Sequence, residues 1–534
     1  MTVDVEICFY PHANYLGTNL TYEECCGDPL SGVDCFVSLG GLFSWDFCCE
    51  TPEPDTCSWD HILGSIAAST DEVGDTLLEA LYGSPMLLRE FCCVVPGDAL
   101  HPCWRLFAME PTELVHNPYV QCCNPILRRL LAQNQEEPWV QVELDREFAP
   151  LEGKRWTTWE LQEYQRAQVE GTRPCLVSIR GGYNITVHDR QECCPEPFYD
   201  CSYTIAVASA LSIVGRLQAL PDVDLLVSPS NTNRAFASVP VFTRHRPREP
   251  RSHYVLLPME WQLSPGQGRK QTVAVQRSGA DTAWENRLRS LFWRGSNSNC
   301  LVSCDLPRVS DGLQAFGDCL ESYDCQTPWS MSNWLTMPRG RLLRLSQLYP
   351  ELINARLTGK SQQMEDELWD YCVESNLTDE FSSQQEQGWY AFAINVDGTG
   401  SGDRTYWQIF AGCVVLVQDS PWVSWLVGEI GGPAALVPGE HYIPIRYDLM
   451  DLESKLNLLH EQEEEAKQLA ERSERWARKY LSYDWVLFYL DRAVRRCLGS
   501  GLNAGFRLRV SLWYPYQLGP SALLLSSKLH ATRR

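Results

Sequence analysis

The sequence predicts an α/β protein in which two Rossmann-like parallel-sheet halves enclose a cleft and follow a disulfide-rich N-terminal region. From about residue 135 onward, short apolar runs alternate with segments of helical periodicity, which is typical of parallel strands joined by helices. The cysteines set the first part apart, because 16 of the 23 lie before position 202. The chain of 534 residues is long enough to bury its cores without crosslinks.

Residues 1–134 are the predicted cysteine-rich accessory region. A single cysteine followed by an adjacent pair occurs five times: Cys8 with Cys25-Cys26, Cys35 with Cys48-Cys49, Cys57 with Cys92-Cys93, Cys103 with Cys122-Cys123, and Cys175 with Cys193-Cys194. Such clustering is typical of disulfides formed in an oxidising compartment. Because neighbouring cysteines do not readily bond to each other, we expect most pairs to link neighbouring units. Zinc binding and reduced thiols remain alternatives, although the Cys-x2-Cys spacing is absent.

Residues 135–300 are predicted to form the first half, which the C-terminal helical region 483–534 rejoins. Period-2 and apolar patterns predict strands at Cys175–Ile179, Tyr183–Val187 and Leu220–Val227, and helical spacing predicts a helix over Ser202–Leu217.

Residues 301–482 are predicted to form the second half. The pattern indicates strands at Tyr390–Val396 and Cys413–Val417, and helices over Arg339–Leu348, Arg404–Phe410 and from Asp448 to about Leu481. Strands separated by helices favour a parallel sheet. The run Glu461–Glu465 then lies on a solvated helix face.

Composition excludes several classes of protein. Acidic residues outnumber basic ones, 68 against 45, which gives a formal net charge of −23. Such a surface repels phosphate backbones, so we expect no nucleic-acid partner. No apolar run reaches the ~18 residues that a membrane span requires, so we expect no transmembrane segment in this chain.

The compartment is predicted from the cysteines and from three Asn-x-Ser/Thr sequences, at Asn19, Asn184 and Asn376. The first 20 residues lack Lys and Arg and do not match a signal peptide. We expect a protein of the endoplasmic reticulum or Golgi lumen, or a secreted one, whose native chain begins upstream of Met1. An intracellular protein with unpaired thiols is the alternative.

Two predicted strands end in groups that suit a diphosphate. Leu291–Asn299 runs from an aromatic strand into Arg294, Gly295 and Ser296, and Asn395–Arg404 is a glycine-rich turn that leads into a helix. Arginine matches phosphate oxygens, glycine allows close approach, and helix N-termini attract anions. Ligands in parallel α/β sheets lie at the carboxyl ends of strands. The pattern therefore indicates a nucleoside-diphosphate site gripped by Arg294 and Arg404, although such turns also occur in ordinary packing.

The chain resembles glycosyltransferase family 90, which includes the protein O-glucosyltransferases, over roughly Pro174 to Leu490. The stretches that carry the resemblance are Leu220–Asp224, Trp293–Ser296, Arg339–Leu342, Pro350–Ala355, Asn395–Gly398, Arg404 with Gly412–Leu416, Asp419–Pro421, His441–Pro444 and Asp448–Leu452. The cysteine-rich region is not covered.

The resemblance implies a GT-B architecture and an inverting, metal-independent transferase that needs no cofactor beyond its UDP-sugar substrate. It implies transfer of glucose or xylose from UDP-glucose or UDP-xylose to a hydroxyl on a protein or glycan. The donor-binding positions of this sequence are then Arg294, Gly295, Ser296, Arg339, Asp397, Gly398 and Arg404.

One position departs from the family pattern. Where the resemblance implies a catalytic aspartate, this chain has Asn231, and a neutral amide cannot act as a general base. Asp224 is the fallback base, although an aspartate at a strand start is more typical of a turn or cap. Two alternatives remain: a catalytically impaired UDP-sugar-binding protein, or a cysteine-rich extracellular interaction protein. For Trp293 and His441, purely structural roles also remain open.

Overall fold

The computed structural model contains two main sheets and the helices that cover them. The residues that it describes are 137–168, 173–188, 202–229, 237–248, 253–263, 282–298, 327–360, 364–398, 400–429 and 433–499. It also describes Leu127, Leu130, Leu131, Cys193 and two short strands, 301–303 and 322–324. The predicted cysteine-rich region therefore lies outside the described residues, apart from those three leucines. So does Asn231. The described helices include none that is long and apolar enough to cross a membrane.

The first sheet is mixed, with strand order β2-β1-β3-β4-β6. Its strands are β1 (Cys175–Arg180), β2 (Asn184–His188), β3 (Val223–Val227), β4 (Val241–Thr243) and β6 (Tyr254–Leu256). Strands β3, β4 and β6 are parallel, but β1 is antiparallel to both neighbours, so the expectation of a wholly parallel first half was wrong. The reason is local: Gly181 and Gly182 adopt positive φ in a tight turn, which makes β1 and β2 a hairpin.

The second sheet is parallel throughout, as predicted, with strand order β10-β7-β11-β12-β14. Its strands are β7 (Leu288–Ser296), β10 (Ile353–Gly359), β11 (Tyr390–Asn395), β12 (Val414–Gln418) and β14 (Ile443–Ile445). In chain order this is the doubly wound 2-1-3-4-5 arrangement, whose switch point lies between β7 and β11. Since β7 pairs here, this sheet begins before the predicted boundary at residue 300; local patterns locate a strand but not its sheet.

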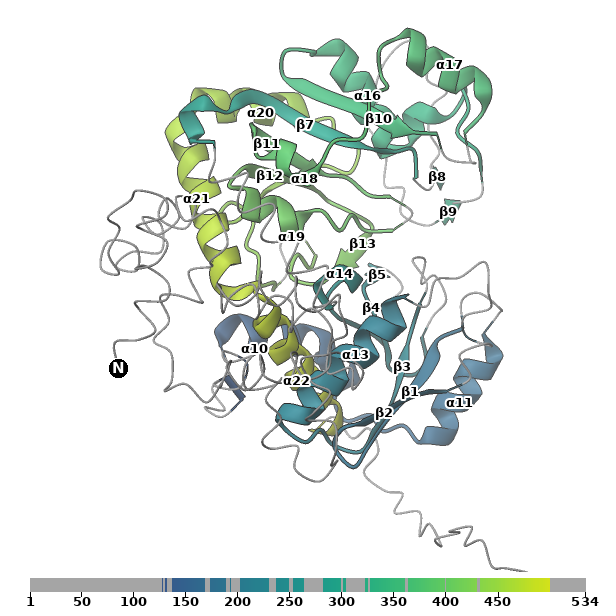
Figure 1. Ribbon diagram of the computed structural model, residues 1–534. Helices are drawn as coiled ribbons and strands as arrows, with labels where there is room; N and C mark the ends of the chain where they lie inside the picture. The colour runs from purple at the N-terminus through teal and green to yellow at the C-terminus, as the bar shows by residue number, and fades with distance from the viewer. Residues whose placement is uncertain are drawn as a thin grey trace, which may run out of the picture.

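Helices lie between the strands and at the end of the chain (Figure 1). They are α10 (Pro138–Phe148), α11 (Thr158–Ala167), α13 (Ser202–Leu217), α14 (Glu260–Leu263), α16 (Pro338–Leu348), α17 (Asp366–Glu374), α18 (Gln384–Gln387), α19 (Thr405–Gln408), α20 (Leu452–Glu461), α21 (Glu463–Tyr480) and α22 (Tyr483–Gly499), with short 3-10 turns such as η5 (Ile409–Ala411). The helix predicted to run to about Leu481 is divided at Gln462, whose non-helical ψ of 54° breaks it into α20 and α21.

One apolar core is shared by the two halves. Along β11 and β12, Ala393 and Val415 face this core, while Ile394 and Leu416 face a second core. Neighbouring residues separate because successive strand side chains point to opposite faces. The shared core also takes in the first sheet and α22, which returns to pack on α13 and α10 of the first half (Figure 1).

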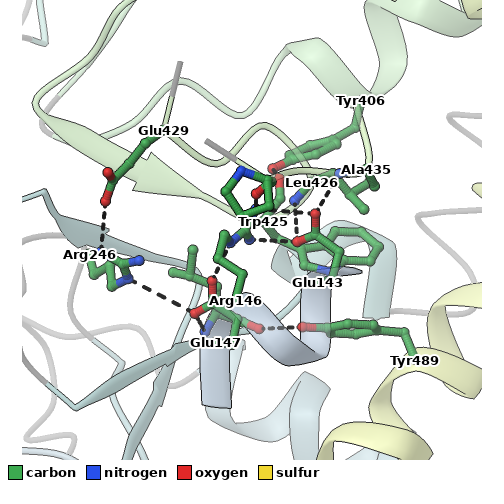
Figure 2. A network of polar contacts seen from close by, with 12 residues as sticks. Glu143, Arg146, Glu147, Arg246, Tyr406, Trp425, Leu426, Glu429, Ala435 and Tyr489 are labelled. Atoms are coloured by element: carbon green, nitrogen blue, oxygen red, sulfur yellow. Dashed lines mark hydrogen bonds and ion pairs between the residues drawn. The ribbon is translucent and has the colours of Figure 1, made fainter. Parts of the chain in front are cut away.

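A polar network on α10 also joins the halves (Figure 2). The buried Glu143 carboxylate pairs with Arg146 at 2.5 Å and accepts hydrogen bonds from the amides of Leu426 and Ala435 in the second half. Arg146 also pairs with Glu147, whose carboxylate accepts from an amide of β6. Close by, β5 (His245–Pro247) pairs with β13 (Trp422–Ser424), so the junction contains backbone, ionic and apolar contacts.

Candidate functional site

Two arginines lie against one tryptophan ring at the switch point of the second sheet. The Trp293 side chain is fully buried, and the guanidinium carbons of Arg339 and Arg404 lie 5.6 and 5.4 Å from its ring centroid. At these distances an aromatic face attracts a cation. Both guanidinium groups therefore contact the same Trp293 ring, although their positive charges repel each other.

Arg339 comes from the first turn of α16, which begins at Pro338 because proline suits the first helical position. Its Nε donates to the Asp397 carbonyl at 2.8 Å, and its Nη1 donates to the Ser296 carbonyl and the Ser298 hydroxyl, both at 2.8 Å. Burial lowers the pKa of Arg339 to about 9, and the neighbouring Arg404 charge adds to that effect. A bound anion would reverse this cost by pairing with the charge.

Arg404 is half-buried and lies directly before the first residue of α19. Its Nη1 donates to the backbone carbonyl of Arg294 at 2.5 Å. Burial lowers the pKa of Arg404, although the charge of the neighbouring Asp403 opposes the shift, and none of the ion pairs between described residues includes Arg404. A desolvated guanidinium without an ion pair suits a phosphate oxygen.

Two glycines leave room for these arginines. A Cβ atom on Gly295 would lie 2.8 Å from Nη2 of Arg404 and 2.7 Å from the Trp293 ring. A Cβ atom on Gly398 would lie 2.8 Å from Nη2 of Arg339. The sequence predicted close approach of a ligand at these turns; the structure shows close approach of the arginine side chains.

The Arg294 side chain does not join this group. Strand alternation directs it to the face opposite Trp293, where its Nη2 pairs with Asp379 at 2.7 Å and its guanidinium lies over Phe292. Its Nη1 donates to the Asn354 carbonyl. The two guanidinium groups that lie together are therefore those of Arg339 and Arg404, whereas Arg294, the predicted partner of Arg404, contributes its backbone carbonyl.

Asp397 lies in a small pocket at the carboxyl ends of β11 and β12, together with Asn395, Ser401, Gln418, Ser420 and Arg248, which comes from the first half. The Ser420 hydroxyl donates to its carboxylate at 2.6 Å. Burial raises the pKa of Asp397 to about 7, although the Ser420 hydrogen bond opposes the shift. The pocket adjoins the arginine pair because the Asp397 carbonyl accepts from Arg339.

The fallback base lies three residues before the carboxyl end of its strand. Asp224 is the second residue of β3, and its carboxylate accepts hydrogen bonds from Ser178, Thr158 and Arg180. Burial raises the pKa of Asp224, but these hydrogen bonds outweigh it and lower the pKa overall. The environment is that of a structural ion pair, which argues against a role as base. Asn231 lies outside the described residues, four positions after β3 ends.

Several other candidates have structural surroundings. His441 accepts a hydrogen bond from the Val437 amide through Nδ1 and packs on Trp476, and burial lowers its pKa. Cys175 and Cys193 form a disulfide, while Cys372 and Cys413 are buried free thiols. That disulfide lies within one cysteine unit, and the cysteines of the four earlier units lie outside the described residues. Within the segments that the structure describes, no three His, Cys, Asp or Glu side chains converge as metal ligands do.

Sequence reasoning missed the ring that organises the site and the contribution of Arg248. The sequence suggested only a core role for Trp293, and the side chain is indeed buried. It also contacts the guanidinium groups of Arg339 and Arg404, which the sequence did not indicate. The alternation of β7 was a usable signal, since it places Trp293 and Arg294 on opposite faces. No local pattern could have brought Arg248 to the pocket, because its approach depends on β5 pairing with β13.

Part of the chain matches proteins of known family. Residues 328–495 match the model of glycosyl transferase family 90. The chain is 33% identical over 160 residues to human protein O-glucosyltransferase 3, which covers 30% of this chain and 29% of that protein. It is 34% identical over 107 residues to zebrafish (Danio rerio) protein O-glucosyltransferase 2, which covers 20% of each. An uncharacterized protein 179R of Invertebrate iridescent virus 6 is 25% identical over 225 residues, 40% of this chain and 17% of that protein.

The matched residues 328–495 contain α16 and the strands β10, β11, β12 and β14 of the parallel sheet. This part of the chain belongs to glycosyl transferase family 90. The chain matches less than a third of the length of these curated relatives.

Proposed function

We propose that the chain is a UDP-sugar-dependent glycosyltransferase that transfers glucose or xylose to a hydroxyl group of a protein or glycan. The observation that carries this proposal is the pair of desolvated arginines, Arg339 and Arg404, on the Trp293 ring. Their position at the switch point is where doubly wound sheets bind nucleotides. The relatives named protein O-glucosyltransferase support the reaction class and a protein acceptor.

The proposed mechanism follows from charge. When the bond between the sugar's anomeric carbon and the UDP oxygen breaks, negative charge develops on the diphosphate. Arg339 and Arg404 would stabilise that charge more in the transition state than in the ground state, which is the requirement for catalysis. Attack from the opposite face by the acceptor oxygen would invert the anomeric centre. Two guanidinium groups could replace a divalent cation, so we propose metal independence.

The GT-B arrangement is part of the same proposal. The acceptor would bind to the first half, and the sugar of the donor would lie near the Asp397 pocket, where Arg248 meets the strand ends of the second half. The cysteine pattern and the disulfide between Cys175 and Cys193 support an oxidising compartment, the endoplasmic reticulum or Golgi lumen or the exterior.

Calorimetric titration with UDP tests this proposal. We expect binding by the parent chain, unchanged by EDTA, and a loss of about 2–4 kcal/mol of affinity in Arg404→Ala, the range for removing a buried charged partner. Arg344→Ala, which removes an arginine on a later turn of α16, is the matched control and should bind as the parent does. A parent that binds no UDP would refute the proposal.

A catalytically impaired UDP-sugar-binding protein is the second candidate, and Asn231 is the observation that favours it. Release of UDP from UDP-glucose and UDP-xylose separates the two, because the impaired protein would bind UDP without turnover. In that case Asn231→Asp should raise the rate by ~10²–10⁴, the usual contribution of a general base.

A further inference from the structure

The carboxyl edge of the first sheet carries a second group of polar side chains that has no part in the diphosphate site. Strands β3, β4 and β6 are parallel, so their carboxyl ends lie at one edge. Arg244 follows β4, and Glu260 follows β6 as the first residue of α14. Tyr203 reaches this edge from the amino end of α13. Arg244 also directly precedes β5, which lies beside β13 at the junction of the halves (Figure 1).

The three side chains contact one another. The guanidinium carbon of Arg244 lies 4.9 Å from the Tyr203 ring centroid, and its Nη1 lies 3.6 Å from Oε2 of Glu260. Arg244 also donates to the carbonyl of Pro229, two residues before Asn231, at 2.9 Å. This places the Glu260 carboxylate close to the strand end that leads to the position where a base was expected.

Two polar atoms of this cluster have no hydrogen-bond partner among the described residues. Among the described residues, the hydroxyl of the fully buried Tyr203 and the Nε of Arg244 have no hydrogen-bond partner. The Glu260 side chain is 29% exposed, and no described residue donates a hydrogen bond to its carboxylate. Buried polar groups normally find partners, so orphan donors beside a partly exposed carboxylate suit a hydroxyl-bearing ligand.

The surroundings of this cluster include a residue of the second half, where the UDP-sugar is proposed to bind. Burial raises the pKa of Tyr203, and the charges of Arg244 and Glu260 and the Tyr406 hydroxyl contribute to its electrostatic surroundings. Tyr406 belongs to α19, the helix that begins directly after Arg404. Arg244 in turn directly precedes β5, the strand that pairs with the second half. The cluster therefore lies at the carboxyl edge of the first sheet, next to the strand that pairs with the second half.

We propose that Glu260 is the general base of the transfer reaction, in place of the aspartate expected at position 231, where this chain has Asn231. This proposal rests on the proposed function. The Glu260 carboxylate would accept the proton of the acceptor hydroxyl as that oxygen forms a bond to the anomeric carbon. The bond from that carbon to the UDP oxygen breaks at the same time, and UDP leaves with the electron pair. Proton, bonds and charge balance without a further reactant.

The other described carboxylates near the junction fit this role less well. Asp397 is buried and accepts from Ser420, Asp419 pairs with Arg248, and Asp224 lies at the start of β3 with three hydrogen bonds. Glu429 pairs with Arg246 at 3.8 Å and comes from the second half. Glu260 alone among these combines a position on the carboxyl edge of the first sheet with a carboxylate that accepts no hydrogen bond from a described residue.

Hydrolysis of UDP-glucose and UDP-xylose, measured as initial rate of UDP release against pH, tests the proposal with water as the acceptor. Glu260→Gln is expected to lower kcat ~10²–10⁴-fold, to leave KM and UDP affinity unchanged, and to remove the acid limb of the pH profile. Glu260→Asp should restore part of the rate. Glu429→Gln makes the same chemical change at another junction ion pair and should leave the profile unchanged.

The outcomes separate this proposal from the one on which it rests. If the parent binds no UDP, the proposed function fails and Glu260 has no reaction to serve. If the parent binds UDP but releases none from either donor, or if Glu260→Gln keeps the rate and pH profile of the parent while binding UDP, the assignment of Glu260 alone is overturned.

Discussion

Arg404 is hydrogen-bonded to the backbone carbonyl of Arg294 and not to any group on its side chain. The contact fixes the end of β7 to the start of α19, and so joins the two strands that flank the switch point. The Arg294 side chain is turned away to Asp379. A position that a motif marks for ligand binding can therefore contribute through its main chain.

Arg294→Ala is expected to lower stability and to leave most of the UDP affinity intact. The substitution leaves Asp379 without its partner but keeps the carbonyl to which Arg404 donates. We expect a loss of about 1 kcal/mol in the free energy of unfolding, because Asp379 is nearly half exposed and such pairs contribute little. Urea denaturation and UDP titration check both parts; a loss of affinity equal to that of Arg404→Ala would return Arg294 to the diphosphate.

Gly295→Ala should impair UDP binding. The added Cβ atom would lie 2.7 Å from the Trp293 ring and 2.8 Å from Nη2 of Arg404, so one of them must shift. We expect at least a tenfold loss of affinity, about 1.4 kcal/mol. Gly359→Ala is the matched control, because a Cβ atom there meets nothing within 4 Å. Equal affinity in both variants would mean that Arg404 is not held in a required position.

These two positions also show what the sequence could and could not predict. Arg404, Gly295 and the parallel second sheet were found because a strand, a glycine turn and a helix start are all local patterns. The side chain of Arg294, the predicted partner of Arg404, points to the other face of the sheet, because a motif marks a residue but not the face to which its side chain points. The hairpin in the first sheet was missed although Gly181 and Gly182 mark a turn, since alternation with helices elsewhere favoured parallel strands.

Asp397 should make stability depend on pH. Burial raises its pKa from the ordinary 3.8 to about 7, so between these values the folded chain binds a proton that the unfolded chain has lost. The contribution of Asp397 to stability is therefore fully present below about pH 4 and falls as pH rises to about 7, by at most ~1.4 kcal/mol per pH unit. The amide of Asp397→Asn does not titrate, so this contribution to the pH dependence of stability is absent from the variant.

Denaturation of the parent and of Asp397→Asn at pH 5 and pH 7.5 measures the effect. The stability of the variant relative to the parent should increase between the two pH values. A difference that stays constant would show that the carboxylate is ionised throughout this range. Ser420→Ala provides a second check, since removing a hydrogen bond that lowers the pKa should extend the slope to higher pH.

Glu143→Gln is expected to destabilise the chain by about 3–5 kcal/mol, the cost of breaking a buried ion pair by altering one partner. The Glu143 carboxylate forms an ion pair with Arg146 and accepts hydrogen bonds from two amides of the second half, so its replacement affects both sides of the junction (Figure 2). Glu163→Gln, in the exposed pair with Arg166, should change stability by less than about 0.5 kcal/mol. Similar midpoints in urea for both variants would contradict this role of the α10 network.

The disulfide between Cys175 and Cys193 closes a loop over a sequence separation of 18 residues. By the loop-entropy relation its removal in Cys193→Ser should cost about 3 kcal/mol of stability. Mass spectrometry after alkylation without reduction should recover Cys175 and Cys193 in one linked peptide pair. Cys372 and Cys413, which are buried, should be alkylated only after unfolding. Free Cys175 in protein from its native compartment would disprove the pairing.

The return of α22 to the first half has a consequence for how the chain is made. The amide of Leu127 donates to the carboxylate of Asp484, 357 residues later, and Tyr489 donates to the Leu256 carbonyl. On the ribosome the first sheet emerges long before these partners, so its shared core stays incomplete until the second half has been synthesised. A nascent chain that stops before residue 483 would expose that apolar face and would be a substrate for chaperones.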